Sequence, residues 1–145
     1  MRYILLGVLL LLLAAGCESS VAPTTFCSTP NLSDEKKEEI KELVKDGNEF
    51  YAIHKISEVD GLIETQLLLT FNPVSFNEVM PLTGPLAEAV AALFDHKVPV
   101  TVVAIFTIAG SDTEMVFGES IFVPETGNIE YMHFGRNHVM RSGDP

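Results

Sequence analysis

Residues 50–71 read FYAIHKISEVDGLIETQLLLTF, and this stretch decides the fold. Its two halves alternate between apolar and polar residues and are separated by Asp60-Gly61. Asp-Gly between two alternating segments is a strong signal for a β-hairpin with a two-residue loop. The sequence therefore predicts strands at residues 50–59 and 62–71.

A two-residue loop also sets the register of this hairpin. The expected pairs are Val59 with Leu62, Ile56 with Thr65 and His54 with Leu67. One face is then mostly apolar, and we assign it to the core; it carries Phe50, Ala52, His54, Ile56, Ile63, Leu67, Leu69 and Phe71.

A second hairpin is predicted at residues 100–109 and 114–123, because both segments are rich in β-branched and aromatic residues. A four-residue turn at 110–113 would pair Val102 with Ile121 and Ala104 with Glu119, which directs Glu119 to the core. The opposite face is too apolar to be fully hydrated. It is therefore a candidate interface, formed by Val103, Ile105, Val116 and Phe122.

Two helices are expected beside these hairpins. The first begins at Ser33, has acidic residues in its first turn and ends near Gly47. The second begins at Pro85, after a breaker-rich connection at 72–84, and continues with an apolar stripe at helical spacing. That stripe comprises Leu86, Ala89, Val90, Leu93 and Phe94.

The pattern predicts one α+β domain at residues 33–134. We expect an antiparallel sheet of four to five strands, the last at 129–134, with two helices packed mainly on one face. The element order is α-β-β-α-β-β(-β). A tether at 17–32 precedes the domain and a polar tail at 135–145 follows it.

Catalytic signatures are sparse. The sequence contains no phosphate-binding loop, nucleophile elbow, His-Glu-x-x-His or Cys-x-x-Cys. Glu130, His133 and His138 lie close in sequence, but on a strand the first two point to opposite faces, so no metal site is predicted. The predicted registers put His54 and Glu119 on core faces, where a titratable side chain needs a partner. They could form a buried polar pair, whereas a bulge around Gly118 would turn Glu119 outward.

The charge balance restricts the class of partner. The chain has 20 acidic and 9 basic residues and a formal charge of −11. Nucleic-acid binding requires clustered Lys and Arg, so we expect no nucleic-acid partner. No cofactor is predicted either.

The N-terminus has the layout of an export signal. Arg2 is followed by an unbroken apolar run at residues 4–15 and then by Gly16-Cys17. The run is shorter than the roughly 20 apolar residues of a spanning helix. We therefore predict a signal peptide at residues 1–16.

The cysteine after Ala14-Ala15-Gly16 resembles the lipobox of bacterial lipoproteins, which usually has Leu where this chain has Ala14. The resemblance implies lipidation of Cys17 and a membrane anchor formed by its acyl chains. It also implies location in the cell envelope, and Glu18 in place of Asp favours the outer membrane of a two-membrane bacterium. Cys27 would then be an unpaired thiol.

Three functions remain open from the sequence. The first is a lipid-anchored envelope protein that acts by binding a protein or ligand, or by self-association, without catalysis. The second is a small-molecule, ion-binding or hydrolytic domain that uses His54 and Glu119. The third is a secreted protein whose Cys17 and Cys27 form a disulfide.

Overall fold

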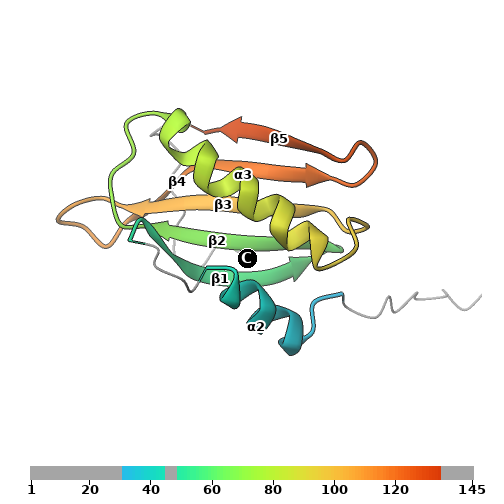
Figure 1. Ribbon diagram of the computed structural model, residues 1–145. Coiled ribbons are helices and arrows are strands. Elements are labelled where there is room, and N and C mark those ends of the chain that lie inside the picture. The colour runs from blue at the N-terminus through green and yellow to red at the C-terminus, as the bar shows by residue number, and fades with distance from the viewer. Residues whose placement is uncertain (1–30, 45–48, 135–145) are drawn as a thin grey trace, which may run out of the picture.

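The computed structural model describes residues 31–44 and 49–134, which form two helices and five strands in one sheet. The helices are α2 (Asp34–Glu42) and α3 (Phe76–Ala92). The strands are β1 (Tyr51–Val59), β2 (Leu62–Leu69), β3 (Val100–Thr107), β4 (Glu114–Val123) and β5 (Asn128–His133). They lie in the sheet in sequence order, as Figure 1 shows.

The predicted α+β class and element order are confirmed, but the sheet is mixed. β2 and β3 run parallel, whereas the other three neighbouring pairs run antiparallel. The reason is the length of α3, whose 17 residues span about 25 Å at 1.5 Å per residue. This helix carries the chain back along the sheet, so β3 starts at the same end as β2 (Figure 1).

The predicted start of the second helix at Pro85 is wrong, because α3 begins nine residues earlier, at Phe76. Ser75 caps it by accepting a hydrogen bond from the Asn77 N–H at 3.2 Å. The Glu78 carboxylate accepts the N–H of Val74 at 3.0 Å, which completes an arrangement similar to a capping box.

The two prolines inside α3 lie on its exposed side. Pro81 and Pro85 are four residues apart and both are solvent-exposed. Each removes one helical N–H and leaves the carbonyl four residues earlier without its usual donor. The residues that carry these carbonyls, Asn77 and Pro81, are both solvent-exposed, and the helix continues through both prolines.

A bulge in β1 changes which side chains face the helices. Ile53 pairs with Leu67 and Lys55 with Gln66, so His54 is an extra residue without a partner in the register. The predicted pairs on the loop side of the bulge are confirmed, but the predicted pairing of His54 with Leu67 is wrong. Beyond the bulge, Tyr51 and Ile53 contact the core in place of Ala52 and His54.

A second bulge shifts the register between β3 and β4. Ala104 pairs with Gly118 and Ile105 with Val116, so Phe117 is the extra residue, and its side chain packs in the core. Gly118 lies beneath α3, where a Cβ atom would overlap the Phe76 ring and lie 2.7 Å from the Met132 carbonyl oxygen. Because of the bulge at Phe117, Ala104 pairs with Gly118, and the predicted pairing of Ala104 with Glu119 is wrong.

Both helices pack on the same side of the sheet, which we call the helix face; the other side is the open face. Ile40 of α2 is fully buried in one cluster with residues of α3 and of three strands. The other buried members of that cluster are Ile63, Leu67, Leu86, Ala87, Val90, Ala91, Val100, Val102 and Phe122. A second cluster on the helix face comprises Leu69, Val79, Ala104, Phe106, Met115 and Phe117.

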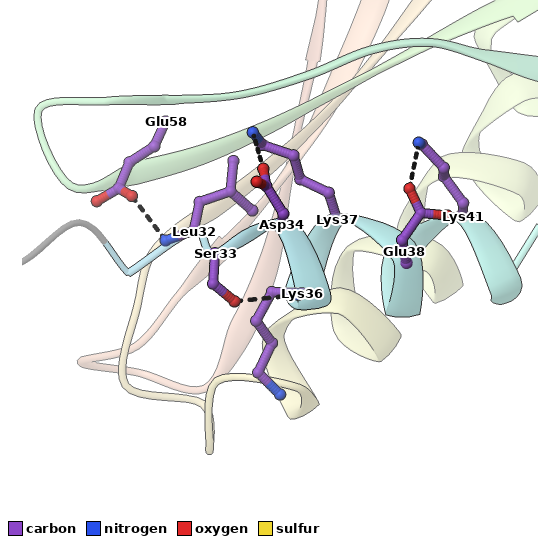
Figure 2. A network of polar contacts seen from close by, with 8 residues as sticks. All are labelled: Leu32, Ser33, Asp34, Lys36, Lys37, Glu38, Lys41 and Glu58. Atoms are coloured by element: carbon purple, nitrogen blue, oxygen red, sulfur yellow. Dashed lines mark hydrogen bonds and ion pairs between the residues drawn. The ribbon is translucent and has the colours of Figure 1, made fainter.

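The start of α2 agrees with the prediction. The Ser33 hydroxyl accepts the Lys36 N–H at 3.2 Å and caps the helix (Figure 2). The Glu58 carboxylate, near the end of β1, accepts the Leu32 N–H at 2.8 Å (Figure 2). This contact ties the segment that precedes α2 to the sheet.

Two buried hydroxyl groups meet beneath α3. The Oγ atoms of Thr83 and Ser120 are 2.6 Å apart. Thr65, on β2, is also fully buried, but among the described residues its hydroxyl has no hydrogen-bond partner. An unpaired buried hydroxyl destabilises the folded state.

We predict that Thr65→Val raises the free energy of unfolding by about 1 kcal/mol, because it replaces an unsatisfied hydroxyl with a methyl group of similar size. Thr83→Val is the matched control and should lower it by about 1 kcal/mol, since it leaves Ser120 unpaired. Urea unfolding of the two variants and the wild type measures both changes. A loss of stability in Thr65→Val would contradict this account of the core.

Candidate functional site

The open face carries an apolar centre surrounded by polar side chains. Val103, Ile105 and Val116 form a buried cluster there, against which Leu68 packs. This confirms that the first three of the four predicted interface residues share one face. Phe122 does not belong to this face, because it is 2% exposed in the core on the helix face.

The misplacement of Phe122 has a structural cause. The predicted four-residue turn is in fact a six-residue loop at 108–113, and the bulge at Phe117 then changes the register again. Side chains between the loop and the bulge, such as Val116, keep their predicted face. Those beyond the bulge, such as Phe122 and Glu119, change face.

The apolar centre offers little surface to a partner. Val103, Ile105 and Val116 are only 7%, 1% and 6% exposed. Their side chains pack on one another, so in this structure they act as a second small core.

His54 and Glu119 do not form the predicted pair. His54 lies at the β1 bulge, is 37% exposed at its side chain, and approaches Glu114 of β4 with 3.5 Å between Nε2 and Oε2. The two form an ion pair only when the imidazole is protonated. β2 and β3 lie between their strands, so the pair bridges the sheet across the open face.

Glu119 lies on the open face and is half-buried. Its carboxylate accepts a hydrogen bond from the Thr101 hydroxyl at 3.1 Å. A second polar contact on this face joins the Gln66 amide to Glu64 at 2.7 Å.

A metal site is not formed within the described residues, which contain no group of three or more metal-binding side chains. Glu130 is exposed on the open face, whereas His133 stacks on Phe76 on the helix face, with ring centroids 5.4 Å apart. His138 lies outside the described residues, as do the predicted lipidation residue Cys17 and the thiol of Cys27.

An apolar hollow lies at the end of the sheet where β1 begins and β2 ends; we call it the end pocket. Its volume is about 580 Å³, and it is lined by Phe50, Phe71, Asn72, Val74, Glu78 and Leu82. Pockets of roughly 300–1,000 Å³ with mainly apolar walls are typical of small-molecule sites. Sequence reasoning missed this pocket.

Two lining residues of the end pocket are unusually exposed for their type. Val74 is 75% exposed and Phe50 is 58% exposed. Phe50 makes an edge-to-face contact with Phe71, at a centroid distance of 6.4 Å. The predicted core position of Phe71 is confirmed, since it is half-buried against the second core cluster. The predicted core position of Phe50 is wrong, because Phe50 lies outside the paired segment of β1.

Among the described residues, few polar groups line the end pocket. Glu78 is held in place by the hydrogen bond that it accepts from Val74, and Asn72 is the other polar lining residue. A carboxylate at the wall disfavours an anionic ligand. The pocket therefore suits an apolar group carried by a neutral or cationic molecule.

Comparison of the chain with known protein families, with curated proteins and with solved structures finds no match in any of the three. Within the described residues, neither helix is long and apolar enough to cross a membrane.

Because the open-face cluster is buried, a charged side chain introduced there would lose contact with water and destabilise the folded state. We predict that Ile105→Asp lowers the free energy of unfolding by about 3 kcal/mol or more, because the new carboxylate would be buried without a partner. Thr107→Asp, at an exposed position on the same strand and face, should cost less than about 1 kcal/mol. Urea unfolding distinguishes them, and equal small losses would show that the centre of this face is open to water.

Proposed function

We propose that the protein is a cell-envelope lipoprotein, anchored through Cys17, that binds an apolar group at the end pocket and catalyses no reaction. The observation that supports binding is the exposure of Val74 and Phe50 beside a hollow of ligand size. Exposed apolar side chains that gather around a hollow are typical of binding sites, because burying them against a ligand releases ordered water.

The anchor is supported by the sequence. Residues 14–17 resemble a lipobox, and the mature chain would carry eight basic and twenty acidic residues. This charge balance disfavours an electrostatic attachment to anionic lipids. Acyl chains contribute about 0.8 kcal/mol for each buried CH₂, so two or three chains would hold the domain at a membrane.

We predict that the wild-type protein partitions into the membrane fraction with the mass of residues 17–145 plus acyl chains. Cys17→Ser should abolish both the added mass and the membrane partition. Intact-mass spectrometry of the two proteins provides the measurement. An unacylated wild-type chain that has lost two hydrogens would instead support the secreted alternative with a disulfide between Cys17 and Cys27.

Ligand binding at the end pocket can be tested separately from the anchor. The full chain should bind an uncharged apolar dye, N-phenyl-1-naphthylamine, with an increase in fluorescence. Val74→Asp should weaken this binding by about tenfold or more, since it places a charge in an apolar wall. Fluorescence titration measures the dissociation constants.

Val59→Asp is the matched control, because Val59 is also an exposed valine, at 55%, but lies at the far end of β1. It should leave dye binding unchanged. Equal dissociation constants for the wild type and Val74→Asp would exclude the end pocket as the binding site.

A further inference from the structure

The outer edge of β5 has backbone groups available for pairing. Among the described residues, β5 is the last strand of the sheet and pairs with β4 alone (Figure 1). The Phe134 N–H donates to the carbonyl of Phe117, a residue of β4, at 3.3 Å. Because backbone groups alternate in direction along an antiparallel strand, the N–H and C=O groups of Ile129, Tyr131 and His133 point away from β4.

The two edges of the sheet differ in how they discourage further pairing. β1 carries a bulge at His54 and an exposed Lys55, and both features are typical of protected edge strands. β5 pairs with β4 without a register shift and contains neither lysine nor proline. Its side chains Tyr131 and Met132 are 43% and 44% exposed. Within residues 31–44 and 49–134, β5 therefore presents a regular edge that no other strand covers.

We propose that β5 pairs in antiparallel fashion with β5 of a second copy of this chain, and that the two sheets become continuous. This surface is separate from the end pocket, and the proposal does not depend on the proposed function. With a two-fold axis perpendicular to the sheet, one contact provides hydrogen-bond partners for the outward-pointing N–H and C=O groups of both copies. Pairing of the three outward-pointing residues on each side would form up to about six backbone hydrogen bonds.

Symmetry and charge together select the register. Residues directly opposite each other must point to the same face, so the register has to be centred on one residue, with the axis passing between its two copies. A register centred on Glu130 would place two carboxylates opposite each other, which is unfavourable. Centring on Tyr131 places Tyr131 opposite Tyr131 of the second copy and Glu130 opposite Met132, without a like-charge pair.

The charge of the protein supports this location for a contact between copies. At a formal charge of −11, two copies repel each other, and any contact must avoid adding to that repulsion. β5 carries a single carboxylate, Glu130, among its six residues. The proposed register places that carboxylate beside an apolar side chain.

The test introduces charges at position 132 of the full chain, purified in a mild detergent. Met132→Lys would place an opposite charge facing Glu130 of the second copy and should tighten dimerisation by about fivefold, counting both symmetric pairs. Met132→Glu should weaken it by about fivefold for the opposite reason. Sedimentation velocity over a range of concentrations, in density-matched buffer, measures the dimer dissociation constants.

A control separates this contact from one within the chain, because Met132 also lies opposite Glu119 of β4. Adding Glu130→Gln to Met132→Lys removes the carboxylate of the second copy and leaves Glu119 in place. The double variant should therefore return to about the wild-type dissociation constant. A wild-type chain that stays monomeric at all concentrations would overturn the proposal, as would a double variant that keeps the tighter dimer or two position-132 variants with equal constants.

Discussion

The structure depends on the long crossover helix α3. It covers the centre of the helix face, and its length brings the chain back to the end of the sheet at which β2 starts. A helix starting at Pro85 would be too short to make this return. The hydrogen bonds of Ser75 and Glu78 stabilise the start of α3 near Phe76. A helix that begins there is long enough for β3 to run parallel to β2.

The fold was predictable where local chemistry acts alone. The Asp60-Gly61 loop, the Ser33 cap and the limits of β4 agree with the sequence analysis. Ser75 and Glu78 have the spacing of a capping box and so indicate the start of α3 in the sequence. Pro81 and Pro85, by contrast, disfavour a helix that passes through both positions. Helix propensity predicts a break at an interior proline; here the apolar side of α3 packs on the sheet and outweighs that cost.

The bulges could not be predicted from alternation, because one extra residue reverses the faces of all side chains beyond it. This explains why His54 and Glu119 were expected in the core and are found on the open face. Gly118 was the only local signal, since a glycine in a strand often marks a bulge. The end pocket was missed for a related reason. Its residues come from two strand ends and a breaker-rich connection, which only the folded chain brings together.

The hydrogen bond from Leu32 to Glu58 has a consequence for how the domain would be presented on a cell surface. It fixes the root of the tether at one end of β1, whereas the end pocket opens at the other. Nine residues of strand separate them by about 30 Å. If Cys17 is lipidated as proposed, the chain enters the domain at the end of β1 that is farther from the end pocket, so the point of entry leaves the pocket uncovered.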